Sequence, residues 1–327
     1  MDYRPWTWKL PEDYKERQPK IRRQDAYERV SGHAVYTRDI SLPGMLYAKI
    51  LTSPYAHAKI KSIDSSAAEA LPGVRDVLKY SDPDVRNDTG IGAWYEVSGN
   101  YDILTLPGTS DYYQHPMGVA VVADSDEICD RALKLMKIEW EERPFVLDME
   151  ESAKPGAVKI MTEVRRVNEK AREPNTVVAE EVTYGDVERG FAEADKILEY
   201  EVRRTTHSAA GVEAAACVAQ WRGDFLDIWT HHQDIPQWFL VNPQTGRGAE
   251  VPPLAEWSKI TVTMPYQGAL FGGYSWLAYA QCFTRLAVIL AKRADGRPVK
   301  LTFDDSNFCT LSDDAGVYRC KVGAKKD

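Results

Sequence analysis

The residues whose types and spacing could do chemistry lie in the stretch 264–275, Met-Pro-Tyr-Gln-Gly-Ala-Leu-Phe-Gly-Gly-Tyr-Ser. Glycine adopts positive φ and lets a ligand approach the backbone closely. An alternating apolar run, 260–264, precedes the stretch, and an apolar segment that we predict as a helix, 276–293, follows it. The unpaired N–H groups at a helix start attract anions, phosphate above all. This order of strand, glycine-bearing turn and helix indicates a seat for a phosphate-bearing cofactor.

A simpler interpretation of the same residues is a tight turn that packs a helix onto a sheet. The glycines do not form Gly-x-Gly-x-x-Gly, and the stretch lacks the lysine of a phosphate-binding P-loop. On the local residues alone the tight turn is favoured, so a cofactor site needs support from elsewhere in the chain.

The elements that must position this stretch belong to an α+β chain of 327 residues, a length typical of two or three domains. Residues 1–24 form a polar arm, in which Trp6 and Trp8 pack either on a neighbouring chain or on this one. We predict an α+β domain over 25–150 and a charged linker over 151–182. The rest of the chain, 183–327, forms a further unit.

Hydrophobic periodicity and turn residues predict the elements of both units. Ser65 and Ser125 are the expected helix N-caps, and Ile128, Ala132 and Leu135 are expected on one helix face. The predicted helices cover 67–71, 127–137 and 191–194. The predicted strands cover 45–52, 74–80, 117–122, 138–141, 198–205, 213–221, 226–230, 260–264, 299–303 and 317–322. Arg222-Gly223-Asp224 is the expected turn of a hairpin.

Composition excludes several classes of partner. The net charge of −8 argues against nucleic acid and against an anionic membrane surface. The apolar segment after Trp276 contains Gln281, Thr284 and Arg285, so it is too polar to span a bilayer. The first residues show no signal-peptide pattern, and we expect a cytoplasmic protein unless a partner exports it.

The five cysteines are scattered without metal-binding spacing, and we expect buried, reduced thiols. Any electron-carrying cluster would therefore lie on another chain. His57 and His115 each lie beside a turn, where a lone histidine is more often structural than a ligand, and neither receives a role.

Several stretches together resemble the molybdenum hydroxylase family, which includes xanthine dehydrogenase and aldehyde oxidoreductase. Their order and rough spacing match from about residue 25 onwards. Gly-Asp-Val-Glu-Arg-Gly-Phe-Ala-Glu-Ala-Asp at 185–195 is very close to a family motif. The other stretches are 32–40, 53–64, 111–124, 126–147 with Trp-Glu-Glu-Arg-Pro at 140–144, Val212-Glu213, Trp-Thr-His-His-Gln at 229–233, Phe271-Gly272-Gly273 and Gly-Arg-Pro-Val at 296–299.

The resemblance implies an a/b hammerhead domain over 25–150, followed by the first part of a molybdopterin-binding domain over 183–327. It implies molybdopterin with molybdenum, expected as the cytosine dinucleotide and shared with a partner chain. A divided molybdenum subunit, as in nicotinate dehydrogenase, would place the second half and the catalytic glutamate on that partner. The [2Fe-2S] clusters and FAD are expected on an iron–sulfur subunit and a flavin subunit.

Site residues follow from the matched motifs. Gln233 falls on the glutamine that donates a hydrogen bond to an oxo ligand of molybdenum. Phe271, Gly272 and Gly273 fall on the loop whose backbone approaches the pterin and metal. Tyr274 and Ser275 replace the family's Lys-Glu and would face the substrate, which argues against purine oxidation because serine carries no charge.

The roles of Glu213 and His231 stay open. Glu213 resembles a hydrogen-bonded structural acid of the family rather than a base. Strand alternation places His231 on the Gln233 face, where packing and cofactor support are equally good interpretations.

The implied function is hydroxylation of an aromatic or N-heterocyclic substrate with oxygen from water. The alternative is a non-catalytic assembly subunit that retains the fold, which the altered glycine loop, with Gly268-Ala269-Leu270, supports. An unrelated α+β binding module would require the matched motifs to be coincidence. We also expect the strand 317–322 to present an unpaired edge that a second polypeptide completes.

Overall fold

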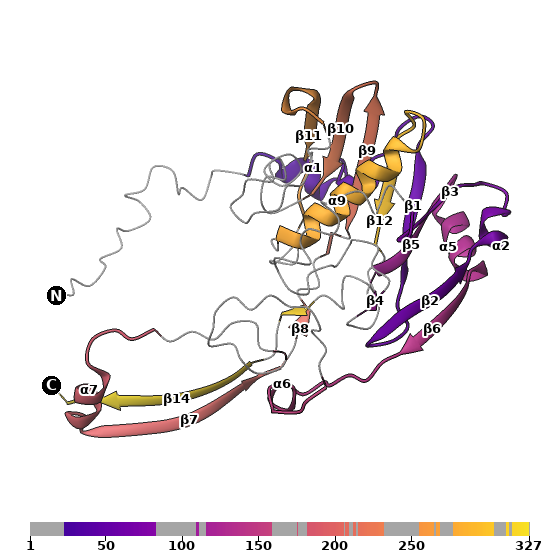
Figure 1. The fold of residues 1–327 in the computed structure, drawn as a ribbon. Coiled ribbons are helices and arrows are strands. Elements are labelled where there is room, and N and C mark those ends of the chain that lie inside the picture. Colours follow the sequence, from indigo (N-terminus) through magenta and orange to yellow (C-terminus); the bar gives the residue numbers. More distant parts are fainter. Residues whose placement is uncertain are drawn as a thin grey trace.

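A seven-stranded mixed sheet is the centre of the molecule (Figure 1). The computed structural model describes residues 23–82, 109–110, 116–158, 175, 182–205, 207–208, 212–213, 215–231, 255–264, 266–268, 277–303, 312–313 and 316–326. The strand order is β11-β10-β9-β12-β1-β5-β3. The strands are β1 (Leu46–Thr52), β3 (Val74–Lys79), β5 (Pro116–Ala123), β9 (Ala216–Arg222), β10 (Phe225–Thr230), β11 (Ile260–Thr263) and β12 (Val299–Thr302).

One seam joins strands from the two predicted domains. β1 pairs in parallel with β12 in the register Leu46 to Val299, and the Leu46 N–H donates to Pro298 O at 2.8 Å. The first and last thirds of the chain therefore share one sheet. The predicted domain boundaries, at 24, 150 and 182, stay predictions.

The strand directions bring four carboxyl ends to one edge of this sheet. β9 is antiparallel to both β10 and β12, while β10 is parallel to β11 and β12 is parallel to β1. β1, β10, β11 and β12 therefore all end at the same edge, which we call the carboxyl edge. Ligands of open α/β sheets bind outside such an edge.

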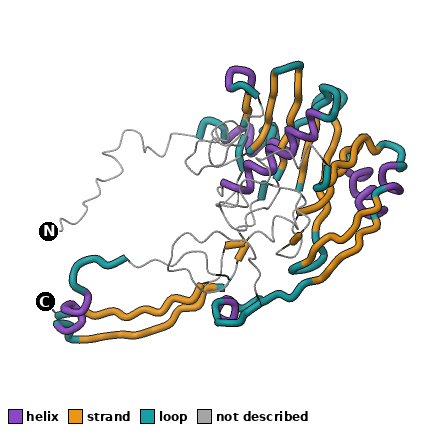
Figure 2. The backbone as a smooth tube through the Cα atoms, viewed as in Figure 1, coloured by secondary structure: helices purple, strands orange, loops and turns teal. Residues whose placement is uncertain are grey.

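The helix α9 (Leu277–Lys292) covers one face of the sheet, over β9 and β12 (Figures 1 and 2). The prediction over 276–293 is thus confirmed. Its buried residues from Leu286 to Ala291 pack on Ala48, Cys217, Ile228 and Leu301. At roughly 25 cal/mol per Å² of apolar surface, this cluster is the main stabilising contact of the sheet.

Two further helices, α2 (Ser66–Glu69) and α5 (Asp126–Leu135), pack beside β3 and β5 on a second cluster. The Ser125 hydroxyl accepts from the Ile128 N–H at 3.3 Å, as predicted for an N-cap. Ser65 occupies the predicted N-cap position of α2 but makes no capping bond, because its hydroxyl donates instead to Glu69. Leu135, at the end of α5, is 43% exposed, whereas Cys129 and Ala132 are buried.

A three-stranded sheet of β4 (Thr109–Ser110), β2 (Ala58–Asp64) and β6 (Lys137–Glu142) lies against this part. The Ile60 side chain of β2 packs over Gly118 of β5. His57 is buried, and its Nδ1 lies 2.7 Å from Pro144 O, which confirms a structural role. The remaining short elements are α1 (Ala26–Val30), η3 (Thr37–Asp39), α6 (Met149–Ser152), β8 (His207–Ser208), η4 (Trp257–Lys259) and β13 (Ser312–Asp313).

A two-stranded ribbon of β7 (Lys196–Arg204) and β14 (Gly316–Ala324) projects away from the sheets, with α7 (Val187–Ala192) at its far end (Figure 1). The helix α7 begins four residues before the predicted turn over 191–194, and Asp186 caps it. β14 pairs with β7 over nine residues, from Gly316–Arg204 to Ala324–Lys196. The predicted strand 317–322 is thus confirmed, and β7 pairs with one of its edges. Among the described residues no strand pairs with the other edge, and its completion by a second polypeptide stays a prediction.

The ribbon has one charged and one apolar face, because opposed residues of antiparallel strands share a face. The charged face carries the pairs Glu199–Lys321 at 3.3 Å and Glu201–Arg319 at 3.0 Å. The apolar face carries the opposed pairs Leu198–Val322, Tyr200–Cys320 and Val202–Tyr318. Leu198, Tyr200 and Tyr318 are each at least half exposed. A two-stranded ribbon is only marginally stable alone, so this apolar face is a surface that requires cover.

Cys129, Cys217 and Cys320 are free thiols. Burial raises the pKa of Cys129 and of Cys217 to about 12, which keeps both protonated. Cys320 is only half-buried, contrary to the expectation that the thiols are all buried, because it lies on the ribbon. In the described part of the chain, no helix is long and apolar enough to cross a membrane.

Candidate functional site at the carboxyl edge

The carboxyl edge gathers the segments that sequence analysis singled out. β10 ends at Thr230 and leads into His231, and β11 ends at Thr263 and leads towards residues 266–268. Glu213 precedes β9, which starts at this edge because it runs antiparallel to β10. Parallel pairing of β10 and β11 thus brings two motifs that are far apart in sequence to one place.

Glu213 is the central polar group of the described part of this site. Its carboxylate accepts a hydrogen bond from the Gly268 N–H, and its side chain is only 5% exposed. Its Oε1 atom is buried and makes no hydrogen bond to a described residue. Burial raises the pKa of Glu213 above that of an exposed glutamate, while the N–H groups of Gly268 and Thr37 oppose the shift. The predicted structural acid therefore lies in the site and holds it together.

His231 faces the same carboxylate. Its Nδ1 lies 3.8 Å from Glu213 Oε1, and its side chain is 1% exposed. The prediction that His231 shares the face of Gln233 stays a prediction, because Gln233 lies outside the described residues. A buried imidazole and a buried carboxyl group therefore lie side by side where the chain leaves β10.

Gly268 can only be glycine in this arrangement. A Cβ atom built on it would lie 2.7 Å from both Cβ and Oε2 of Glu213. The glycine is required here for close approach of a side chain, since its φ is not in the left-handed region.

Arg29 joins this site from the start of the chain and was not predicted. Its Nη1 donates to Gln267 O at 2.9 Å and to Tyr36 Oη at 3.0 Å, and its Nε donates to Asp25 at 2.6 Å. The i,i+4 spacing of Asp25 and Arg29 is a readable helical pair, whereas the contact with Gln267 spans 238 residues and leaves no local signal.

The predicted cofactor and substrate residues lie outside the described residues. These residues are Gln233, Phe271, Gly272, Gly273, Tyr274 and Ser275. The described residues beside them, His231 on one side and Gly268 on the other, come together at the carboxyl edge. The roles of the six residues stay predictions, as does any role for His115, Trp6 and Trp8.

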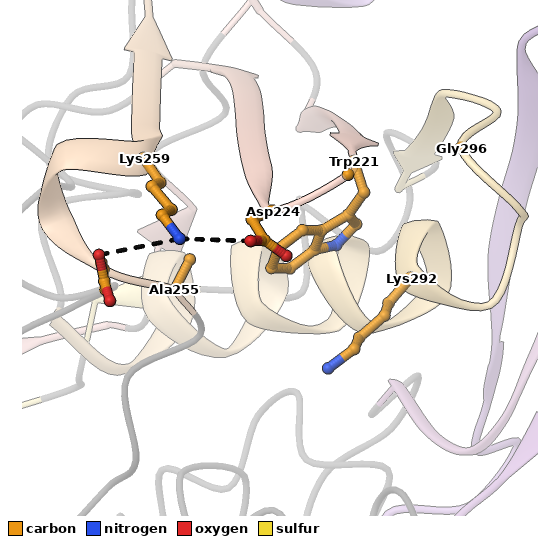
Figure 3. A pocket seen from close by; sticks show the side chains of 8 residues that line it. Trp221, Asp224, Ala255, Lys259, Lys292 and Gly296 are labelled. Carbon is orange, nitrogen blue, oxygen red and sulfur yellow. Dashed lines mark hydrogen bonds and ion pairs between the residues drawn. The ribbon is translucent and has the colours of Figure 1, made fainter.

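A separate pocket of about 520 Å³ lies at the opposite edge of the sheet, beside the β9–β10 hairpin turn (Figure 3). Its Lys259 lies between Asp224, at 3.3 Å, and Glu256, at 3.9 Å, so its charge is matched. The Trp221 Nε1 donates to Val288 O, and the Lys292 Nζ lies 5.7 Å from the centroid of the Trp221 ring. These groups satisfy one another, and the pocket is remote from the carboxyl edge.

The described residues contain no group of three or more His, Cys, Asp or Glu side chains that could hold a metal ion. Two family models match the chain in succession. Residues 31–144 match the a/b hammerhead domain of aldehyde oxidase and xanthine dehydrogenase, and residues 169–327 match the molybdopterin cofactor-binding domain. The chain belongs to the molybdenum hydroxylase family. The predicted α+β fold class and family are thereby confirmed.

Relatives of this molybdenum hydroxylase chain are named as dehydrogenases of several different compounds. A Bacillus subtilis protein named as a probable xanthine dehydrogenase component is 30% identical over 86% of this chain and 34% of its own length. The 6-hydroxypseudooxynicotine dehydrogenase complex subunit gamma of Paenarthrobacter nicotinovorans is 32% identical over 65% of this chain and 26% of its own. The nicotinate dehydrogenase large molybdopterin subunit of Eubacterium barkeri is 29% identical over 93% of this chain and 65% of its own.

Solved structures show the same fold. Quinoline 2-oxidoreductase from Pseudomonas putida 86 superposes with a TM-score of 0.68 at 23% identity, over 93% of this chain and 37% of that one. Aldehyde oxidoreductase from Desulfovibrio gigas gives 0.69 at 20% identity, over 93% and 32%. This molybdenum hydroxylase chain thus spans about a third of the length of most of the relatives named here.

Proposed function

We propose that the chain is the molybdopterin-binding component of a multi-subunit molybdenum hydroxylase. The observation that carries the proposal is the meeting of Glu213, His231 and Gly268 at the carboxyl edge, inside the stretch that matches the molybdopterin cofactor-binding domain. The cofactor is proposed as the cytosine dinucleotide form, with [2Fe-2S] clusters and FAD on other subunits.

The described side chains fit such a cofactor in their charge and their spare hydrogen-bonding capacity. Burial favours the neutral form of Glu213 relative to an exposed glutamate, which limits its repulsion of an anionic pterin phosphate. Its Oε1 atom is buried without a hydrogen bond to a described residue, so it can take part in a further polar contact.

When bound, molybdopterin supplies the redox and oxygen-transfer chemistry of the site. The residues of this chain would bind and orient it. Gln233, two residues after His231, would donate a hydrogen bond to it without adding charge. The glycine-bearing segment would present backbone N–H groups. The catalytic glutamate, which would act as the general base, is expected on the partner.

We propose an aromatic or N-heterocyclic substrate. Relatives named for nicotinate and for 6-hydroxypseudooxynicotine support this class. The test is to purify the complex through a tag on this chain and to measure its molybdenum and pterin content. Activity on a panel of N-heterocycles and aromatic aldehydes in H₂¹⁸O should place ¹⁸O in the product. A complex without pterin would favour the alternative, a non-catalytic assembly subunit.

Gln233→Ala is expected to slow turnover strongly while leaving folding almost unchanged. Loss of one positioned hydrogen-bond donor typically costs about 10²–10³ in kcat. A single polar side chain outside the core changes stability by about 0.5 kcal/mol or less. Steady-state rates per bound molybdenum and thermal melts of the same preparations measure both effects. Equal rates per molybdenum would contradict the role of Gln233.

We further propose that the apolar face of the ribbon is covered by a second molybdopterin subunit. The face is apolar, at least half exposed at Leu198, Tyr200 and Tyr318, and lies beside an open strand edge of β14. The relative from Eubacterium barkeri is named a large molybdopterin subunit, which supports a divided arrangement. An interface that completes a domain buries about 2,000 Å² or more.

Tyr318→Ser is expected to abolish capture of this partner, because it removes a large apolar side chain from the proposed interface. Lys321→Ser is the matched control on the charged face, where an exposed ion pair contributes little. Co-expression with tandem-affinity capture, followed by size-exclusion chromatography, measures the effect. Equal capture by both variants would refute the apolar face as the interface.

A further inference from the structure

One peptide group at the carboxyl edge is held at both of its ends. The Gln267 C=O accepts a hydrogen bond from Arg29 Nη1 at 2.9 Å, and the Gly268 N–H donates to Glu213. These two groups belong to the same planar peptide unit. Two charged side chains, 184 positions apart in the chain, therefore fix the orientation of a single peptide plane.

Arg29 is itself held rigidly. Its guanidinium carbon lies 5.6 Å from the ring centroids of both Tyr36 and Tyr266, and these rings are 6.1 Å apart. Its Nε pairs with Asp25, and the hydrogen bond to Asp25 raises the pKa of Arg29 further above its usual value. The planar guanidinium uses its fork of donors on three partners at once, which a lysine ammonium cannot reproduce in the same geometry.

The position needs such a clamp because its residue is glycine. Gly268 makes room for Glu213, but a glycine leaves the adjacent torsion free to rotate. Rotation of the 267–268 peptide would break both hydrogen bonds together. With both bonds made, the orientation of the 267–268 peptide is fixed.

We propose that Arg29 is a positioning residue, which with Glu213 locks the 267–268 peptide as part of the molybdopterin site. This inference rests on the proposed function for its cofactor, whereas the lock itself concerns only this chain. The lock would make the segment 25–39, which lies at the start of the hammerhead domain, part of the molybdopterin site.

The experiment uses the complex purified through a tag on this chain, with Arg29→Ala, Arg29→Lys and the control Arg297→Ala. Arg297 also donates to a distant backbone oxygen, Gly44 O at 2.8 Å, but away from the carboxyl edge. Hydrogen–deuterium exchange of the Gly268 amide should quicken by about tenfold or more in Arg29→Ala, the loss expected for one charge-assisted hydrogen bond. It should quicken less in Arg29→Lys and stay unchanged in Arg297→Ala.

The second measurement is the pterin content of the complex after gel filtration. It should fall most in Arg29→Ala, less in Arg29→Lys and not at all in Arg297→Ala. Unchanged exchange at Gly268 in both Arg29 variants would overturn the lock. Faster exchange with full pterin content would overturn the positioning role. A wild-type complex without pterin would refute the proposed function and with it the cofactor role of Arg29, while the exchange pattern still decides whether the lock exists. Arg29→Lys keeps the test decisive if Arg29→Ala fails to fold.

Discussion

Gly118→Val is expected to lower the free energy of unfolding strongly. Gly118 lies in the buried part of β5 with φ of +74°, a conformation that costs a β-branched residue about 1–3 kcal/mol. A Cβ there would lie 2.4 Å from Ile60 Cδ1, and overpacking of this kind costs about 1–3 kcal/mol more. The sum is a large part of a typical stability of about 5–15 kcal/mol. Urea denaturation followed by tryptophan fluorescence measures the loss.

Gly44→Val is the matched control for this prediction. Gly44 has a similar φ of +70°, but no atom lies within 4 Å of its added Cβ. Only the backbone strain remains, so its loss should be about half that of Gly118→Val or less. Equal losses in the two variants would show that contact with Ile60 contributes nothing.

Glu213→Ala is expected to lower the free energy of unfolding and to empty the cofactor site. The change leaves the partly buried Gly268 N–H without its acceptor, which costs up to about 1–3 kcal/mol, the cost of an unsatisfied buried donor. It also frees the 267–268 peptide. Chemical denaturation and pterin content measure the two effects. Glu256→Ala, at a glutamate whose side chain is 74% exposed, should change neither.

Glu213→Gln separates the effect of the glutamate's charge from that of its hydrogen bond. The measurement is the free energy of unfolding as a function of pH. Burial raises the folded-state pKa of Glu213 above the unfolded value of 4.5, so the folded state keeps a proton that the unfolded state releases. The contribution of Glu213 is therefore most favourable below pH 4.5 and declines as pH rises towards its folded pKa. The glutamine variant lacks this decline, so its stability relative to wild type should rise from pH 4 to pH 7. A constant difference across that range would contradict the raised pKa.

Local elements of this fold were predictable because their causes are local. Ser125 caps its helix three residues before Ile128, and Gly223 turns the β9–β10 hairpin with φ of +63°. The apolar periodicity after Trp276 predicts α9 almost to the residue. Each signal depends on residues within a few positions of one another.

The carboxyl-edge contacts were not predictable from the sequence for the opposite reason. Glu213 meets Gly268 and Arg29 meets Gln267 only once β9, β10 and β11 have paired. The pairing within the ribbon was not predictable for the same reason. The sequence predicts the strand 317–322, but its partner β7 lies more than 100 residues earlier. Ser65 shows a smaller failure, since a nearby glutamate took the hydroxyl expected to cap the helix.

The place of β12 in the sheet has a consequence for synthesis of the protein. β12 is the middle strand of seven, between β9 and β1, yet its residues 299–302 are made near the end of the described chain. Until they leave the ribosome, β1 and β9 each present a bare strand edge lined by apolar side chains, a surface prone to aggregation. Translation must therefore run past residue 302 before the halves of the sheet can join, and we expect a nascent chain halted earlier to need a chaperone.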